Sequence, residues 1–358
     1  MPLLTNVYGN PSSIHRAGRE ARTVMESARA TIARILNCSE SEIYFVSGGT
    51  EADNFALQGI AYQNRQYGNH IITSRVEHKA VLQTCKMLEK KGFEITYLNV
   101  DRSGRVDPQA VKEAIRPETI LISIIHGNNE VGTLNPIAEI GKAAKDSNAY
   151  FHSDCVQSFG KLPLDVQRLK LDLLSISAHK IYGPKGIGAL YIRRGTRIDT
   201  MFFGGNHENK RRAGTENLPG IAGFAKAAEL MAATMENDTR QIGQLRDYLQ
   251  DSLLKTIDNI EINGHETDRL YNLLNVSFPG CDSEMILLAL DMNGIAVSIG
   301  SACTSGNIEP SHVLSAMGLS AAAVKSGIRF SLGKQNTRED IEIVVETLQG
   351  IVQQLRGQ

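Results

Sequence analysis

The chain has 358 residues, 42% hydrophobic and 22% charged, a composition typical of a globular protein with a large core and about two domains. Its net charge of −1, from 38 basic and 39 acidic residues, gives no reason to expect nucleic acid or an anionic membrane as a partner. No apolar run approaches the roughly 18 residues of a membrane span, and "MPLLTNVYGNPSSIH" does not have the pattern of a secretory signal.

The cysteines are odd in number, widely spaced and without a CxxC pair. They are Cys38, Cys85, Cys155, Cys281 and Cys303. This pattern argues against a disulfide framework or a structural zinc site, and it favours a reducing, cytoplasmic setting. Any one cysteine is by default a small buried apolar residue.

From about Ser41 to Arg194, short β-branched runs alternate with segments of helical length. Strands are predicted over 42–47, 70–74, 94–100, 119–125, 149–154, 171–177 and 188–193, with helices such as 77–91 and 137–147 between them. Several of these runs are apolar on both faces, which is typical of a sheet covered by helices on both sides. We expect an α/β large domain with a mostly parallel, seven-stranded sheet over residues 1–236, with the N-terminal residues partly in the small domain.

The pattern changes after about Asn237. An amphipathic helix is predicted over 239–256, strands over 273–278, 294–300 and 327–333, and a last helix from Thr337. Thr337 and Asp340 are predicted to form a capping pair. An apolar stripe follows, formed by Ile341, Val344, Val345, Leu348, Ile351, Val352 and Leu355. We expect a smaller α+β domain over 237–358.

A glycine pair joins the first predicted strand to a helix, in Gly48-Gly49-Thr50. Glycines let the backbone approach an anion, and free N–H groups at a helix N-terminus attract phosphate. A tight strand-to-helix turn with no ligand explains the residues equally well.

An acid and a lysine follow two neighbouring predicted strands. Asp154 ends one strand, at the edge where open parallel sheets bind ligands, although it could instead cap the next helix. Lys180 follows an apolar strand, where an amine can have a lowered pKa and act as a nucleophile, whereas most lysines are surface residues. Ser177 and His179 beside it can bind phosphate. Phosphate ligands, one acid and one lysine are what pyridoxal phosphate requires.

Ten stretches in order resemble the cysteine desulfurases of the bacterial iron–sulfur-assembly type, which have the aspartate-aminotransferase-like fold, type I of the pyridoxal phosphate enzymes. They are "GNPSSIH", "SGGTEADN", "EHKAV", "NNEVGT", "DCVQS", "SAHKIYGPKGIGALY", "RRAGTEN", "GSACTSG", "EPSHVL" and "IRFSLG". They cover nearly the whole chain, and their combination is highly specific.

The resemblance implies a role for each matching residue. Lys180 resembles the lysine that binds the cofactor covalently, and Asp154 the acid that keeps the pyridine nitrogen protonated. Gln157 is similar to the residue that bonds the ring's phenol oxygen, and His78 to the imidazole stacked on the ring. Without the resemblance, a capping or solvated role for His78 is the simpler interpretation.

The same resemblance implies ligands for the phosphate and the substrate. The implied phosphate ligands are Gly49, Thr50, Ser177, His179 and, from the other subunit of a homodimer, Thr215. Asn129 and Arg329 resemble the pair that holds the substrate carboxylate, a task that suits the planar fork of arginine. Without the resemblance, a salt bridge at a strand end is the alternative for Arg329.

Cys303 lies in "SIGSACTSGN", the stretch richest in glycine and serine. The resemblance implies that its thiolate takes sulfur from L-cysteine as a persulfide, leaves L-alanine, and passes the sulfur to an iron–sulfur scaffold or other acceptor. The small residues predict a carrier segment that serves both partners. No metal site is expected, apart from Cys303 as a transient cluster ligand.

Two other activities remain open. Selenocysteine lyase uses the same ring chemistry, and a scaffold that binds the cofactor poorly could merely dock sulfur acceptors. An ordinary aminotransferase would have no task for Cys303.

The sequence departs from the family pattern in two places. Relatives carry a short strand and an Asn-Ala-Ala-Thr-Thr-like segment about twenty residues before "YGNPSSIH", whereas this sequence starts just before Tyr8. The stretch "GGNHENKRR" has Asn209-Lys210 where many relatives have Arg-Gly, and His207 where Gln is common. The second departure is expected to affect the dimer edge more than the ring chemistry.

Overall fold

The computed structural model describes residues 2–300 and 310–357. The chain divides into two compact units. Unit 1 comprises Met1–Leu98, Pro108–His126 and Pro136–Met235, and unit 2 comprises Asn99–Asp107, Gly127–Asn135 and Glu236–Gln358. Unit 2 therefore includes two short segments from the N-terminal half, which the alternation of strands and helices does not reveal.

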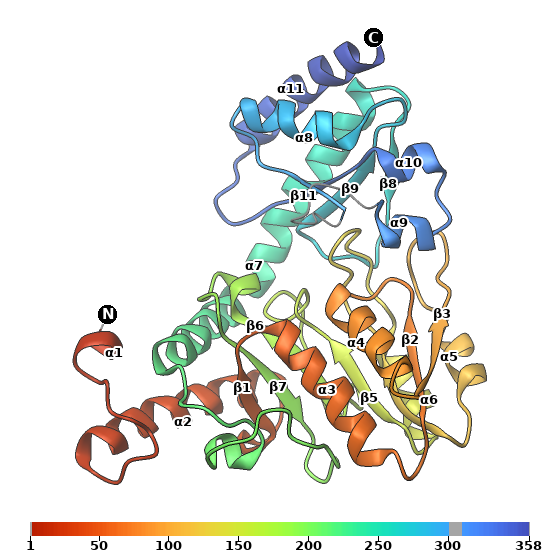
Figure 1. Cartoon of the computed structure of the whole chain (residues 1–358). Coiled ribbons are helices and arrows are strands. Elements are labelled where there is room, and N and C mark those ends of the chain that lie inside the picture. The colour runs from red at the N-terminus through yellow and green to blue at the C-terminus, as the bar shows by residue number, and fades with distance from the viewer. Residues whose placement is uncertain (1, 301–309, 358) are drawn as a thin grey trace. The chain divides into compact units, whose positions relative to one another are not determined.

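Unit 1 is built on a seven-stranded sheet in the order β1-β7-β6-β5-β4-β2-β3 (Figure 1). The strands are β1 (Ile43–Val46), β2 (His70–Ser74), β3 (Glu94–Leu98), β4 (Thr119–Ser123), β5 (Tyr150–Asp154), β6 (Leu173–Ser177) and β7 (Gly188–Ile192). Only β7 runs against its neighbours, β6 and β1. The mostly parallel sheet is therefore confirmed, and each predicted strand matches one of these seven to within two residues at either end.

Helices cover this sheet, which explains why every residue of β1, β2, β4, β6 and β7 is buried. The unit contains α1 (Pro2–Thr5), α2 (Arg16–Leu36), α3 (Gly49–Asn64), α4 (Lys79–Glu89), α5 (Pro108–Ala114) and α6 (Ile137–Lys145). Helix α3 lies across the central strands and packs against α4 (Figure 1). Helix α2 was not predicted, because much of its buried face is alanine, such as Ala21, Ala28 and Ala33, rather than a stripe of large apolar residues.

Helix α7 corrects the sequence prediction. It spans Leu218–Thr256 and runs from unit 1 into unit 2, whereas the predicted helix began only at residue 239. Pro219 lies in the first turn of α7, where proline is tolerated. A Cβ on Gly223 would lie 2.5 Å from Pro184 Cγ, so this glycine allows close packing. None of the helices in the described part of the chain could span a membrane.

Unit 2 contains a four-stranded antiparallel sheet in the order β10-β11-β9-β8. Its strands are β8 (Glu261–Asn263), β9 (Leu273–Ser277), β10 (Ser298–Ile299) and β11 (Gly327–Ser331). Its other helices are α8 (Ser283–Met292), α9 (His312–Ala316), α10 (Ala321–Lys325) and α11 (Arg338–Arg356). The strand predicted over 294–300 was too long, since only β10 pairs, and β8 was not predicted.

The start of α11 confirms the predicted capping pair. Thr337 N donates to Asp340 Oδ2 at 2.9 Å, and Asp340 N donates to Thr337 Oγ1 at 3.2 Å. Every residue of the predicted stripe is buried or partly buried in the core of unit 2. The apolar period therefore predicted correctly which face of α11 packs inward.

Candidate active site

The strand ends of unit 1 bring several predicted site residues to one edge of the sheet. Gly188, at the start of β7, pairs with Ser177 at the end of β6 and with Val46 at the end of β1. Asp154 ends β5 and pairs with Ser175 of β6. The segments after β1, β5 and β6 thus begin side by side, although they are far apart in the sequence.

The turn from β1 into α3 fits an anion. Gly48 at the N-cap has no side chain to bond the first N–H groups of α3, so these remain available to a phosphate. A Cβ on Gly48 would lie 3.6 Å from Ser177 Oγ, which shows how closely the turn approaches β6. Ser177 Oγ in turn bonds His179 Nδ1 at 2.8 Å. Gly49, Thr50, Ser177 and His179 therefore offer the donors predicted for a phosphate site.

Asp154 is buried, with 4% of its surface exposed. Burial raises the pKa of its carboxyl group, while His78 and Lys180 act to lower it. Its Oδ1 accepts a hydrogen bond from Val156 N at 2.9 Å, so it also bonds the backbone that follows β5. Its other carboxylate oxygen accepts no backbone hydrogen bond within the described part of the chain, and it suits a cationic ring nitrogen.

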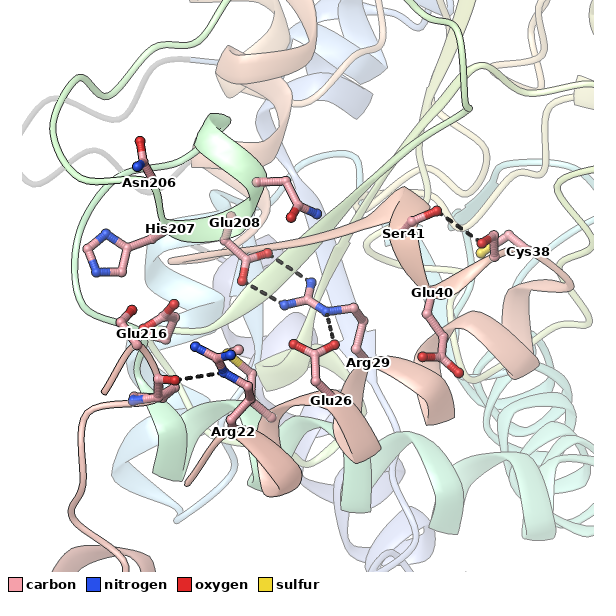
Figure 2. Close-up of a pocket in the computed structure, with 15 residues that line it drawn as sticks. Arg22, Glu26, Arg29, Cys38, Glu40, Ser41, Asn206, His207, Glu208 and Glu216 are labelled. Carbon is pink, nitrogen blue, oxygen red and sulfur yellow. Dashed lines mark hydrogen bonds and ion pairs between the residues drawn. The ribbon is translucent and has the colours of Figure 1, made fainter. Parts of the chain in front are cut away.

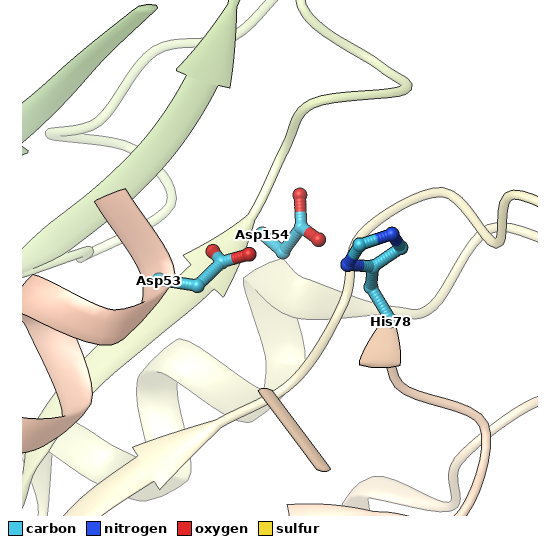
Figure 3. Close-up of side chains that lie close together, drawn as sticks. All are labelled: Asp53, His78 and Asp154. Carbon is cyan, nitrogen blue, oxygen red and sulfur yellow. The ribbon is translucent and has the colours of Figure 1, made fainter. Parts of the chain in front are cut away.

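Asp53 is a second buried acid that the sequence reasoning missed. It lies on α3 and points toward Asp154 and His78, and the ligand atoms of the three residues lie within 4.8 Å of one another (Figure 3). Burial, and then the charge of Asp154, raise the pKa of Asp53 well above its usual value. Two carboxylates and an imidazole could also hold a cation, but the nearby amine of Lys180 favours an organic cation at Asp154 over a metal ion.

His152 of β5 is a buried histidine that lies beside Asp53. Its ring nitrogens bond Ser123 Oγ and Ser175 Oγ, each at 2.9 Å, and burial lowers the pKa of the imidazole to about 3. The ring is therefore neutral, and its Nε2 lies 3.7 Å from Asp53 Oδ1, an oxygen without a hydrogen-bond partner in the described structure.

His78 is the N-cap residue of α4. Its Nδ1 accepts a hydrogen bond from Ala80 N at 3.1 Å, so a neutral ring carries its proton on Nε2. The capping role is thus present, and the partly exposed ring still points toward Asp154 (Figure 3). Capping and contact with a cofactor are compatible.

Lys180 lies in the short helix η2 (Ala178–Ile181), directly after β6. It acts electrostatically on Asp154, and also on His179 and Lys161. Burial, followed by these lysines and Lys185, lowers the pKa of His179. Unit 1 thus offers a turn with N–H groups at a helix start, a buried acid and a lysine amine, a set of donors that fits pyridoxal phosphate.

Gln157 follows Asp154 and contacts a buried lysine. Lys161 Nζ donates to Gln157 O at 2.8 Å and lies 3.4 Å from Gln157 Oε1. Sequence reasoning did not single out Lys161 or the buried Glu77, whose Oε1 accepts bonds from Ser74 Oγ and Ile125 N. The available signal for Lys161 was its spacing of four residues from Gln157.

The predicted substrate ligands lie in unit 2. Arg329 of β11 donates from Nη1 to Asn129 O at 2.7 Å, so it contacts the backbone rather than the side chain of Asn129. The Nε of Arg329 is buried and lacks a hydrogen-bond partner among residues 2–300 and 310–357, and no ion pair of Arg329 occurs there. Burial lowers the pKa of this guanidinium, with Glu130 acting in opposition. A buried guanidinium with an N–H group that has no partner among the described residues suits the carboxylate of a substrate.

Two predicted residues take no part in the contacts described above. Thr215 is exposed between η3 (His207–Lys210) and α7. Cys303 lies outside the described residues.

A cavity of about 810 Å³ lies elsewhere in unit 1, and none of its lining residues is a predicted site residue (Figure 2). Arg29 and Glu208 form a buried, bidentate ion pair in its wall, with N–O distances of 2.9 and 2.8 Å.

Glu208, Asn209 and Lys210 all have positive φ angles, and the φ of Lys210 is +67°. Glycine adopts such a φ angle without strain, and it is the residue that the family resemblance predicts at position 210.

Comparison with known proteins identifies the family. The class-V aminotransferase family matches residues 1–344. The cysteine desulfurase IscS of Dictyoglomus turgidum is 51% identical over 99% of this chain and 90% of its own, and that of Methanosarcina thermophila is 51% identical over 100% and 88%.

Solved structures agree with this assignment. A NifS-like protein superposes with a TM-score of 0.93 at 36% identity, covering 98% of this chain and 93% of that one. SspA in complex with cysteine gives a TM-score of 0.83 at 37% identity, covering 92% of each chain. The chain belongs to the cysteine desulfurases of the class-V aminotransferase family, which are enzymes that depend on pyridoxal phosphate.

Proposed function

We propose that the enzyme takes sulfur from L-cysteine, releases L-alanine, and carries the sulfur as a persulfide on Cys303 to an acceptor in iron–sulfur cluster or thio-cofactor assembly. The observation that carries the proposal is the buried Asp154 with Lys180 in electrostatic range, beside a phosphate-binding turn. The names of the relatives support the reaction, and a relative described in complex with cysteine supports the substrate.

Each residue proposed to bind the cofactor has a different chemical task. Pyridoxal phosphate, when bound, supplies a conjugated pyridinium ring that takes up electrons from the bonds around the substrate's Cα. Asp154 would keep the ring nitrogen protonated, and the turn at Gly49 and Thr50, with Ser177 and His179, would hold the phosphate. Lys180 Nζ would hold the cofactor covalently, and as a free amine it would be the base for the substrate's Cα proton.

His78 and Cys303 then act on the substrate. The Cys303 thiolate attacks the substrate sulfur, so that an S–S bond forms as the C–S bond breaks and the electron pair stays with carbon. That carbon takes a proton, for which His78 Nε2 is the available donor because Nδ1 accepts from Ala80 N. The products are alanine and a persulfide on Cys303. Arg329 and Asn129 hold the substrate carboxylate.

The working form is proposed to be a cytoplasmic homodimer. Thr215 is exposed in the single chain, which supports a phosphate contact donated to the other subunit, and Phe203 nearby is 85% exposed. The four cysteines of the described residues are free, which supports a reducing compartment. The 1–236 segment is proposed as the cofactor domain and 237–358 as the small domain with the Cys303 segment.

The test separates cofactor binding from sulfur transfer. Cys303→Ala is expected to keep the yellow colour of the bound cofactor but to lose about a thousandfold or more of alanine formation from L-cysteine, as when a nucleophile is removed. Lys180→Ala is expected to lose both colour and turnover.

Cys38→Ala serves as the matched control, since Cys38 is partly exposed and lines the cavity of Figure 2, which contains no predicted site residue. It should leave alanine formation unchanged. Turnover retained by Cys303→Ala would contradict the sulfur-carrier role. Turnover of selenocysteine but not of cysteine would favour the selenocysteine lyase. A wild-type protein that is colourless would favour the scaffold.

A further inference from the structure

Lys161 is a buried lysine to which the proposed mechanism gives no task. It lies in the segment between β5 and β6, is 6% exposed, and takes part in no ion pair among the described residues. Burial, and then the nearby Lys180, lower the pKa of its amine to about 7. Burying an amine without a counter-ion costs folding free energy, so the presence of Lys161 at this buried position calls for a function.

Both side-chain hydrogen bonds of Lys161 in the described part of the chain go to Gln157. Its Nζ donates to the backbone oxygen at 2.8 Å and reaches the side-chain Oε1 at 3.4 Å. A side-chain amide has an oxygen end that accepts and a nitrogen end that donates, and either end can face a neighbour. A lysine amine in its ammonium form offers only donors, so it selects the oxygen end and turns Nε2 away from itself.

We propose that Lys161 is a positioning residue that orients the Gln157 amide, so that Nε2 is presented to the phenol oxygen of pyridoxal phosphate. The inference rests on the role proposed for Gln157 above. Lys161 does not itself contact the cofactor in this arrangement. It acts through Gln157, and it also adds positive charge near His179, on the phosphate side of the site.

The first measurement is the affinity of the cofactor-free protein for pyridoxal phosphate. Lys161→Met keeps the length of the side chain and removes the donor. Its Kd is expected to rise about tenfold, the effect of losing one hydrogen bond to a charged group. Lys142→Met, at an exposed position of α6, is the matched control and should leave the Kd unchanged.

A double-mutant cycle separates positioning from a general effect on the fold. Gln157→Met is expected to raise the Kd and to shift the absorbance maximum of the bound cofactor, and Lys161→Met should shift that maximum in the same direction. The double variant should bind no worse than Gln157→Met alone, because both changes remove one interaction. Additive losses, or an unshifted maximum in Lys161→Met, would overturn the proposal.

The melting temperature of each cofactor-free variant checks the fold. Lys161→Met should melt within about 3 °C of the wild type, because the lost contact is offset by the relief of a buried amine. If that variant cannot be purified, Lys161→Gln replaces it in the cycle. An amide can face Gln157 with either end, so about a threefold rise in Kd is expected, and an unchanged Kd overturns the proposal.

These measurements use no cysteine. An enzyme that binds the cofactor but does not desulfurate cysteine would contradict the proposed function and leave the result on Lys161 intact.

Discussion

Three buried carboxyl groups lie within electrostatic range of one another near the end of β5, on Asp53, Glu77 and Asp154. Burial raises the pKa of each, because an ionised carboxylate loses its hydration. A negative charge on one of these carboxylates also disfavours the ionisation of the other two. A cationic ring nitrogen at Asp154 would favour ionisation there, and Asp53 and Glu77 would then remain neutral acids that hold their protons.

Glu77 offers a test of this arrangement through pH. Burial raises its pKa from 4.5 to about 8, so the folded protein keeps a proton that the unfolded chain releases above its ordinary pKa. Stability should therefore fall as the pH rises from about 4.5 to about 8, by at most about 1.4 kcal/mol per pH unit from this group. Glu77→Gln keeps the acceptor Oε1 and removes the titration, so its stability should depend less on pH.

The measurement is the melting temperature of cofactor-free protein at several pH values in that window. Glu346→Gln, at an exposed position of α11, is the control and should follow the wild type. If the Glu77→Gln curve also runs parallel to that of the wild type, Glu77 is already ionised in the folded state.

At the scale of elements, the turn between β1 and α3 joins the proposed phosphate site to Asp154. A Cβ on Gly49 would lie only 2.7 Å from Val156 Cγ2. Valine is stiff at χ1, and the N–H of Val156 donates to Asp154 Oδ1. A displacement of Val156 would therefore be transmitted to the residue proposed to bind the ring nitrogen.

Gly49→Ala is expected to destabilise the protein by about 1–3 kcal/mol through overpacking, and to weaken cofactor binding. Gly350→Ala makes the same chemical change in α11, where nothing lies within 4 Å of the new Cβ. That control should stabilise the protein by about 0.5–1 kcal/mol, because alanine is the better helix former. Urea unfolding and cofactor titration measure both variants. Equal stability of the two would show that the Gly49 contact relaxes at no cost.

At the scale of the whole molecule, a few contacts join distant parts of the chain. Arg29 of α2 and Glu208 of η3 are 179 positions apart and form the buried pair in the wall of the large cavity (Figure 2). Glu208 also accepts from Phe45 N of β1 at 2.8 Å. This carboxylate thus attaches the segment that precedes Thr215 to both α2 and the edge of the sheet.

Arg29→Met should destabilise the protein by about 3–5 kcal/mol, because Glu208 would remain buried without its cation. The double variant with Glu208→Met should recover much of that loss, since neither charge then remains. Lys226→Met breaks the exposed pair with Glu229 and should cost less than about 1 kcal/mol. Chemical denaturation gives all three values. A small effect of Arg29→Met would mean that water reaches Glu208 in the wild type.

Local patterns determined much of this protein by themselves. Buried strands carry apolar runs, so all seven strands of the large sheet could be predicted, and the 3.6-residue period revealed the packed face of α11. The order of the motifs indicated the family, which the comparisons confirmed. The roles of the site residues rest on the same motifs and stay predictions.

Only the tertiary structure decided which groups meet. Asp53 and Lys161 carry ordinary acid and lysine side chains in the sequence. Nothing local shows that both are buried, or that Asp53 of α3 meets Asp154 at the end of β5. The Arg29–Glu208 pair and the assignment of the 127–135 segment to unit 2 likewise depend on contacts between distant parts of the chain. The physical reason is that propensity and periodicity act over a few residues, whereas burial and charge depend on whatever the folded chain brings within a few ångströms.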